Sequence, residues 1–285
     1  MNNSPKKKIY RTGNNRGWGL NVWSEMIIEV IDSRELTWRL FLRNIRARYR
    51  QTVLGFLWAL IMPLLTIGAF IFLNRAGVLN IGEIDIPYPA YALLGLTVWQ
   101  IFAGGLQSCS NAIVAGGSMV VKINFPKEAL VFSSMGEALV ETLVRSGLTA
   151  IVFCFFNVVP AWSAVLFPFA LIPLLLFTLG IGLMLSLLNV VLRDIANIVP
   201  LATTFLLFIT PVLYPAPEAG FSKFFMTYNP LAVFITAPRD LVVKGCLTQP
   251  DIYFIYSAVS LLLFIIAWRL FHLAEIRIAE RVGAR

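Results

Sequence analysis

The residues best placed to do chemistry in this sequence are charged side chains inside apolar stretches. Glu137, Glu141 and Arg145 recur every four residues within a long apolar run, so they share one face of a helix. Charges at that depth must face protein or water, so they predict either a structural ion pair or a functional gate. A membrane-embedded enzyme would need an acid–base or metal cluster at one depth, and its candidates are Glu137, Glu141 and Asp194.

Other catalytic and ligand-binding patterns are missing from the sequence. His272 is the single histidine and ends an apolar run, so an intramembrane serine protease lacks its base and a zinc protease lacks its ligands. Cys109, Cys154 and Cys246 have no metal or redox spacing, and we interpret them as unpaired small apolar residues. The phosphate-binding pattern G-x-x-x-x-G-K-S/T does not occur, so the chain does not bind ATP by that route. We therefore predict no catalytic, cofactor-binding or metal-binding residues in this chain.

The composition predicts that membrane helices hold these residues in place. Hydrophobic residues make up 58% of the 285 residues and charged residues only 13%, whereas a soluble domain carries roughly 25% charged residues. The formal net charge is +8, but Lys and Arg cluster at the edges of apolar runs, so we predict no nucleic-acid partner. The expected fold class is an all-α polytopic membrane protein.

Six apolar runs predict transmembrane helices, since a bilayer needs about 20 residues per helix. They cover residues 52–73, 90–114, 130–157, 164–190, 198–214 and 252–271 and form a transmembrane domain over residues 52–271. Residues 215–250 are rich in aromatic side chains that would be costly to expose, so we expect two short re-entrant helices before the last span.

A basic amphipathic helix is predicted over residues 32–51, directly before the first span. Its apolar face holds Trp38, Phe41, Leu42, Ile45 and Tyr49, and a second stripe holds Arg39, Arg43, Arg46 and Arg50. Leu36 and Leu40 fall outside the apolar stripe. We expect this helix to lie in the membrane interface with its arginines toward anionic headgroups. The alternative is an ordinary surface helix packed on a core.

The distribution of positive charge predicts the orientation of the spans. Residues 1–31 form a basic tail without a signal-peptide pattern, and residues 272–285 form a basic C-terminal tail. Eighteen Lys and Arg residues fall on the side of these tails and four on the opposite side. Because positive loops stay in the cytoplasm, we predict that both termini are cytoplasmic.

Four short motifs resemble a known family. They are Leu54-Gly55-Phe56-Leu57-Trp58 followed by Pro63, then Phe125-Pro126-Lys127-Glu128, Arg193-Asp194-Ile195 and Tyr228-Asn229-Pro230. Each motif alone is weak, but their order and their positions relative to the spans are specific. The chain resembles, over about residues 33–272, the permease subunit of type-2 ABC exporters, and within these the permeases for O-antigen, capsular polysaccharide and teichoic acid.

The resemblance implies partners and roles for these motifs. It implies two permease copies and two copies of a separate ATPase, which would bind ATP and Mg, with no cofactor in this chain. By similarity, ATPase coupling would fall to Lys122, Phe125, Pro126, Lys127, Glu128, Arg193 and Asp194. Gating would fall to Leu54, Gly55, Trp58, Tyr228, Asn229 and Pro230, and residues 215–243 would form the outer gate.

Aromatic rings are further candidates, for a substrate path at the interface between the two permease copies. A sliding polymer needs many shallow binding sites, and aromatic faces attract sugar rings with little directional demand. The candidates are Trp58, Phe70, Tyr91, Trp99, Phe102, Phe205 and Phe208. The alternative for each ring is packing against lipid or a neighbouring helix.

These observations together predict a function in transport and not in catalysis. We expect a permease subunit that exports an undecaprenyl-type lipid-linked polysaccharide across the bacterial inner membrane, in contact with membrane lipids. Alternatives are an ABC exporter of a lipid or drug, and a membrane-embedded enzyme that modifies a glycan or lipid. A secondary transporter would need matching broken spans in both halves, and the sequence has no such repeat.

Overall fold

The chain folds into a bundle of α-helices. The computed structural model describes residues 20–50, 57–76, 84–123, 125–215 and 228–283, and these contain helices and connections but no strand. The all-α class is therefore confirmed. The helices are α1 (Leu20–Asp32), α2 (Arg34–Arg50), α3 (Trp58–Arg75), α4 (Tyr88–Gly116), α5 (Ser118–Lys122), α6 (Glu128–Phe155), η2 (Trp162–Leu166), α7 (Phe167–Ala170), α8 (Ile172–Val191), α9 (Ile195–Ile209), α11 (Pro230–Val243) and α12 (Pro250–Gly283).

Four helical segments of the described chain are long and apolar enough to cross a membrane. They are Tyr88–Gly116, Glu128–Phe155, Trp162–Val191 and Pro250–Glu275. All four lie within a few residues of a predicted span. Two further predicted spans correspond to the shorter apolar helices α3 and α9, so the full count of six spans stays a prediction.

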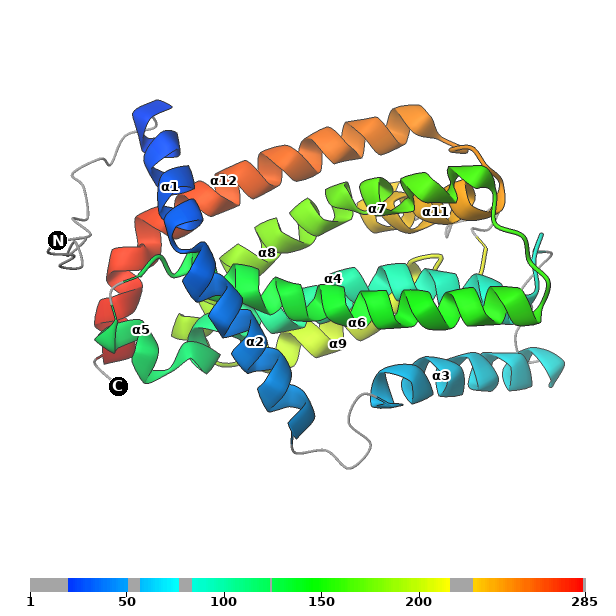
Figure 1. The fold of residues 1–285 in the computed structure, drawn as a ribbon, viewed down its shortest axis with the longest axis horizontal. Coiled ribbons are helices and arrows are strands. Elements are labelled where there is room, and N and C mark those ends of the chain that lie inside the picture. The colour runs from blue at the N-terminus through cyan, green and yellow to red at the C-terminus, as the bar shows by residue number, and fades with distance from the viewer. Residues whose placement is uncertain (1–19, 51–56, 77–83, 124, 216–227, 284–285) are drawn as a thin grey trace, which may run out of the picture.

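Helix α4 is the centre of the bundle. It packs against α6 and α8, with α3 and α9 beside it, and α12 lies against α8. In Figure 1 consecutive long helices run in alternating directions, with α5 and the end of α12 at one end of the bundle and α7 and α11 at the other. We name these the α5 end and the α11 end. Helix α2 crosses α6 near the α5 end.

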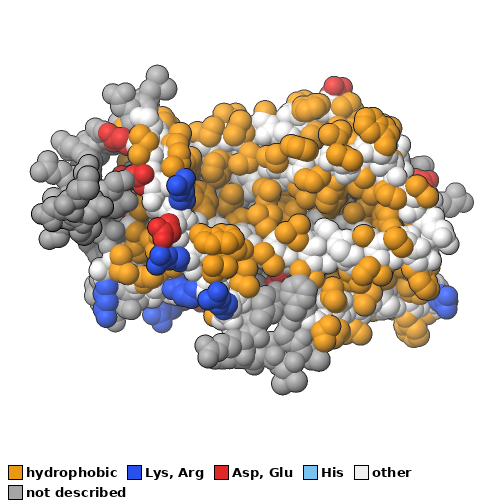
Figure 2. All heavy atoms as spheres, viewed as in Figure 1, with side chains coloured by type: hydrophobic (Ala, Val, Ile, Leu, Met, Phe, Trp, Pro, Cys, Tyr) orange, Lys and Arg blue, Asp and Glu red, His pale blue; other side chains and the backbone are white. Residues whose placement is uncertain are grey.

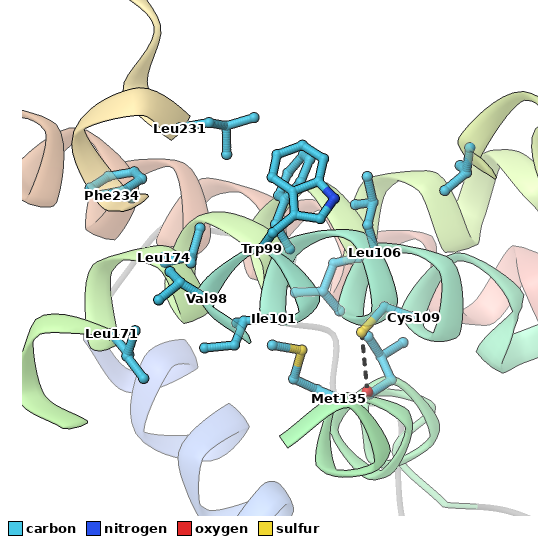
Figure 3. Packing of buried hydrophobic residues seen from close by; sticks show 14 of the residues in the cluster. Val98, Trp99, Ile101, Leu106, Cys109, Met135, Leu171, Leu174, Leu231 and Phe234 are labelled. Atoms are coloured by element: carbon cyan, nitrogen blue, oxygen red, sulfur yellow. Dashed lines mark hydrogen bonds between the residues drawn. The ribbon is translucent and has the colours of Figure 1, made fainter. Parts of the chain in front are cut away.

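The core forms because α4 is apolar all round, which is the pattern of a buried membrane helix. Its side chains at Ala92, Leu93, Val98 and Ile101 are fully buried. Figure 3 shows Val98 and Ile101 of α4 among side chains of the neighbouring helices. The Cys109 thiol donates to the Val131 carbonyl at 3.6 Å. Cys109, Cys154 and Cys246 are all unpaired, as the sequence predicts.

Helix α2 forms where the amphipathic helix is expected, but its buried face differs from the prediction. Leu40 is 4% exposed and Leu36 packs on the core, whereas Trp38 of the predicted apolar stripe is 58% exposed. The two leucines outside the stripe therefore help to fix α2 to the bundle, together with Phe41 of the stripe, whose ring approaches Gly136 of α6. The position of α2 at a membrane interface stays a prediction.

Both predicted tails contain helix. Residues 20–32 form α1, which buries Val22 and Met26 and sets Trp23 edge-on to Trp268 of α12 at 6.4 Å. At the other terminus, α12 continues through the segment predicted as a tail to Gly283. Of the region before the last span, the structure describes one helix, α11, and residues 216–227 lie outside the described part.

Candidate functional site

The motif Phe125-Pro126-Lys127-Glu128 forms an elbow between α5 and α6. All four of its side chains are buried, and Glu128 is only 1% exposed. Pro126 has no backbone N–H and fixes its own φ, so it favours a break between two helices. The predicted coupling residues Phe125, Pro126, Lys127 and Glu128 therefore do not offer their side chains to a partner. They hold the elbow from inside.

The elbow is fastened to the last helix by a group that we call the elbow latch: Lys127, Glu128, His272 and Glu275. The backbone N–H of Lys127 donates to the Glu275 carboxylate at 3.0 Å, and His272 Nδ1 lies 3.1 Å from Glu128 Oε1. The Lys127 ammonium donates to the carbonyl of Phe125 at 2.8 Å. Burial lowers the pKa of this ammonium, while the carboxylates of Glu275 and Glu128 act in the opposite direction.

The same latch is the one group in the described residues with donor atoms close enough to share a metal ion. The donor atoms of Glu128, His272 and Glu275 lie within 4.8 Å of one another. However, Glu275 already accepts the Lys127 amide, and Glu128 lies at hydrogen-bond distance from His272. We interpret these contacts as structural, because they join two elements that are distant in the sequence.

The remaining predicted coupling residues lie on the surface. Lys122 ends α5 and is exposed, next to Ile123, which is 48% exposed. Arg193 and Asp194 are exposed in the turn between α8 and α9. The directions of these helices in Figure 1 place that turn at the α5 end as well. These three charged side chains are available to a partner at one end of the bundle.

A buried arginine organises the opposite end, and we call its contacts the Arg239 clamp. Arg239 of α11 is 4% exposed, and its guanidinium carbon lies 3.9 Å from the centre of the Tyr91 ring of α4. Its Nη1 donates to the Tyr91 hydroxyl at 2.5 Å and to the Pro211 carbonyl at 3.1 Å. Its Nη2 donates to the Val212 carbonyl at 2.7 Å. One side chain thus joins α11, α4 and the turn that follows α9.

The clamp requires a close approach that glycine provides. A Cβ on Gly95 of α4 would lie 2.2 Å from Arg239 Nη2 and 2.3 Å from the Val212 carbonyl oxygen. Any larger residue at position 95 would therefore displace either the guanidinium or the backbone that it binds.

Asn229 adds a second connection between α9 and α11. Its side-chain oxygen accepts from the backbone N–H of Leu231, so it caps α11, and its amide nitrogen donates to the Thr210 hydroxyl at 3.0 Å. Tyr228 is 66% exposed, and Pro230 occupies the first position of α11. Of the other predicted gating residues, Trp58 begins α3 and is 43% exposed. Leu54 and Gly55 lie outside the described residues.

The seven candidate rings divide into two groups. Tyr91, Trp99 and Phe102 are at most 9% exposed and belong to the core of the chain. Trp99 lies 5.3 Å from Phe102, and ring contacts continue from Phe102 through Phe177 and Phe234 to Tyr256. These three rings are packed inside one chain, which favours the packing alternative for them, and their place on a path between two copies stays a prediction.

The other four rings lie at or near the surface. Phe205 and Phe208 of α9 are 62% and 57% exposed, and Trp58 is exposed at the start of α3. Phe70 is half-buried against the core. These four rings remain available to a partner, a lipid or a substrate.

The charged residues within α6 do not form a catalytic cluster with Asp194. Glu141 is buried and accepts a hydrogen bond from the Gln100 side chain of α4 at 2.6 Å. Glu137 and Arg145 are half-buried on the same helix. Asp194 lies in the exposed turn between α8 and α9, so the structure does not bring the three candidate carboxylates to one depth.

Sequence reasoning did not single out Arg239 or Glu275. A signal for Arg239 was present, because an arginine within the mostly apolar run Leu231–Val243 needs a buried partner. Glu275 had no such signal, since it belongs to a charged segment that resembles a solvated tail.

The fold and its two end sites define a multi-pass helical membrane protein with no phosphate-binding loop of its own. The chain belongs to the ABC-2 type transporter family, whose model matches residues 35–242.

Individual relatives are similar over most of their length. The O-antigen export system permease protein RfbA of Klebsiella pneumoniae is 28% identical over 243 residues, which cover 84% of this chain and 91% of that protein. The protein of the same name from Myxococcus xanthus is 27% identical over 261 residues, or 90% and 99% of the two chains. The polysialic acid transport protein KpsM of Escherichia coli is 24% identical over 227 residues, or 74% and 82%.

Proposed function

We propose that this chain is the permease subunit of an ABC exporter that carries a lipid-linked polysaccharide, of the O-antigen kind, across the bacterial inner membrane. The observation that supports this most directly is the similarity over 99% of the length of the Myxococcus xanthus O-antigen export permease. The Escherichia coli relative is named for transport of another polysaccharide, so the cargo class is common to both.

The exporter would contain two copies of this chain and two copies of a separate ATPase. The absence of a phosphate-binding loop in this sequence supports a separate ATPase, which would hold ATP and Mg. Lys122, Arg193 and Asp194 are the exposed charged residues with which this chain would contact it. A short rigid segment seated in a cleft of the ATPase transmits closure of that cleft as a rigid-body shift.

In the membrane the chain would cross six times, by the four long segments together with α3 and α9. The alternating directions of these helices in Figure 1 support this arrangement. Helix α2 would lie in the interface of the cytoplasmic leaflet, and both termini would be cytoplasmic, as the asymmetry of positive charge predicts.

The outer gate would be the α11 end, where the Arg239 clamp and Asn229 connect α11 to the end of α9. Four contacts on this short stretch support a gate that moves as a unit and not as separate loops. Trp58, Phe70, Phe205 and Phe208 are the rings that would face the second copy and the sliding glycan.

The proposal is tested by deleting the gene in its own host and restoring it on a plasmid. We expect loss of one surface polysaccharide and accumulation of its lipid-linked form on the cytoplasmic side, measured by glycan staining and by mass spectrometry of extracted lipids. Both effects should be reversed by the plasmid. Unchanged surface glycans combined with altered drug sensitivity or altered lipid asymmetry would favour export of a drug or lipid and contradict the proposal.

A further inference from the structure

Between α2 and α6 lies an open groove, which we call the α2–α6 groove. It has a volume of about 380 Å³ and is lined by Val30, Arg34, Thr37, Trp38, Phe41, Phe132, Ser133 and Gly136. That volume falls in the range of roughly 300–1,000 Å³ typical of small-molecule sites. The lining of the groove is almost entirely apolar and includes one cationic side chain, Arg34.

The apolar character of the groove is stronger than its residue types suggest. The Thr37 hydroxyl donates to the Ser33 carbonyl at 3.1 Å, and the Ser133 hydroxyl donates to the Leu130 carbonyl at 2.8 Å. Both donors are used within their own chain segment, so a polar ligand would lose its hydrogen bonds with water and gain few in return. A hydrocarbon chain loses nothing on entering such a groove.

The walls are rigid aromatic surfaces. Trp38 and Phe41 lie with ring centres 5.1 Å apart on α2. Phe41 reaches α6 only because residue 136 is glycine: a Cβ there would lie 2.7 Å from the Phe41 ring. Phe132 of α6 is set edge-on against Trp268 of α12 at 6.1 Å. The groove is therefore built from packed side chains on helices.

The guanidinium of Arg34 is not paired with a carboxylate of the described residues. It is exposed and makes no hydrogen bond or ion pair with any residue that the structure describes. The nearby carboxylate of Glu35 forms an ion pair with Arg39, with 2.6 Å between Glu35 Oε1 and Arg39 Nη2. An anionic group is the chemical complement of this position.

With the proposed position of α2 at the membrane interface, the groove would lie at the depth of a lipid headgroup. Ser133 and Gly136 are five and eight residues after the start of α6 at Glu128, which is about 8–12 Å along the helix. Figure 2 shows this face of the molecule, with Lys and Arg side chains gathered toward the α5 end and apolar side chains covering the helices beyond them.

We propose that the α2–α6 groove binds one anionic phospholipid of the adjacent leaflet, with an acyl chain between α2 and α6 and its phosphate on Arg34. The charge of residues 1–19, which contain Lys6, Lys7, Lys8, Arg11 and Arg16, disfavours that segment as the occupant beside Arg34. None of the residues that line the groove belongs to α3 or α9, the helices that carry the exposed candidate rings, so its ligand is a lipid that fixes α2 and not the exported molecule. This site does not depend on the proposed cargo.

The experiment uses the full-length chain in vesicles that contain phospholipids with brominated acyl chains. Bromine quenches tryptophan on contact, and Trp38 lines the groove. The contribution of Trp38 is obtained by subtracting the signal of Trp38→Phe from that of the wild type. We expect Trp38 to be quenched at about fivefold lower mole fraction by brominated phosphatidylglycerol than by brominated phosphatidylcholine, the factor that one surface arginine contributes.

Two variants and two controls test the assignment. Arg34→Gln should abolish the preference for the anionic lipid, whereas Arg39→Gln, which removes an exposed charge already paired with Glu35, should retain it. Thr37→Phe should fill the groove and remove saturable quenching, whereas Leu139→Phe on the exposed face of α6 should not. A preference that survives Arg34→Gln, or saturable quenching that survives Thr37→Phe, overturns the proposal.

Competition identifies the source of the phosphate. Unlabelled phosphatidylglycerol should relieve quenching of Trp38, and inorganic phosphate should not, because the chain must occupy the groove. Relief by undecaprenyl phosphate at lower concentration than by phosphatidylglycerol would assign the groove to the carrier lipid and contradict a phospholipid site. Relief by inorganic phosphate alone would contradict a lipid site altogether.

Discussion

Arg239 has an unusual environment for an arginine, because its side chain is only 4% exposed. A charged side chain removed from water needs partners for its charge and its N–H groups. The two terminal nitrogens of the guanidinium meet this need with two backbone carbonyls, a phenol hydroxyl and the face of the same ring, while its Nε has no hydrogen-bond partner among the described residues. Arginine suits the position because its planar fork reaches two acceptors at once and stacks on an aromatic face, which a lysine ammonium does not do.

We predict that Arg239→Met lowers the free energy of unfolding by about 2–5 kcal/mol, because the Pro211 and Val212 carbonyls lose their donor. Arg239→Lys should recover only part of this loss, since one ammonium does not span both carbonyls. Thermal unfolding of the purified permease in detergent measures both changes. Lys244→Met is the comparison at the same end of the bundle: the Lys244 side chain is 47% exposed, and Asp240, which is 12% exposed, keeps the hydrogen bond from the Thr248 hydroxyl, so the expected change is smaller, about 1 kcal/mol or less.

The burial of the individual candidate aromatic rings could not be predicted from the sequence. In a soluble protein the polar face of a helix reveals which side is buried, but a membrane helix is apolar toward both lipid and protein. Trp99 and Phe205 therefore look alike in the sequence, although one is 6% and the other 62% exposed. Only the packing of α4 at the centre of the bundle distinguishes them.

At the scale of elements, the elbow between α5 and α6 was predictable as a motif but not as a structure. Pro126 indicates a break, and Lys127 and Glu128 are charges of the kind that a partner recognises. Their burial depends on α12 extending past His272, so that Glu275 and His272 meet the elbow. The charges after His272 resemble a solvated tail, and no local pattern shows that they continue a helix docked on another element.

The turn between α8 and α9 is the element that we expect to contact the ATPase most directly. We predict that replacing Arg193 and Asp194 together by alanine leaves the permease in the membrane with unchanged stability, because both side chains are exposed. Glycan export and glycan-stimulated ATP turnover should both fall by at least tenfold. Export is followed by surface staining, and turnover by phosphate release from the purified complex.

A matched control removes charges from the other end of the bundle. Lys244 and Asp251 are also exposed and oppositely charged, so their double alanine variant changes the composition equally. It should export glycan at the normal rate. Normal export by the Arg193 and Asp194 variant, or an equal loss in the control, would contradict a coupling role for this turn.

At the scale of the whole molecule, the distribution of charge and the directions of the helices agree. The elbow, the turn at Arg193 and the end of α12 fall at the α5 end, and the Arg239 clamp falls at the other (Figure 1). The sequence assigns eighteen Lys and Arg residues to the first side and four to the second. The overall arrangement was therefore predictable, because hydropathy and charge are summed over many residues, whereas individual contacts such as the elbow latch were not.

This arrangement predicts the orientation of the chain in the membrane. A reporter active only in the cytoplasm, fused after Arg285, should be active, and a tag inserted next to Ala219 should react with an impermeant reagent in cells whose outer membrane has been opened. The reason is that moving the basic α5 end across the bilayer would act against the membrane potential, at about 2.3 kcal/mol per charge per 100 mV. The opposite topology would be shown if a tag at the C-terminus of the chain reacted with an impermeant reagent in intact, right-side-out vesicles of the inner membrane. The opposite topology would also place Arg193 and Asp194 outside the cytoplasm, where a cytoplasmic ATPase cannot contact them, so the coupling prediction depends on this result.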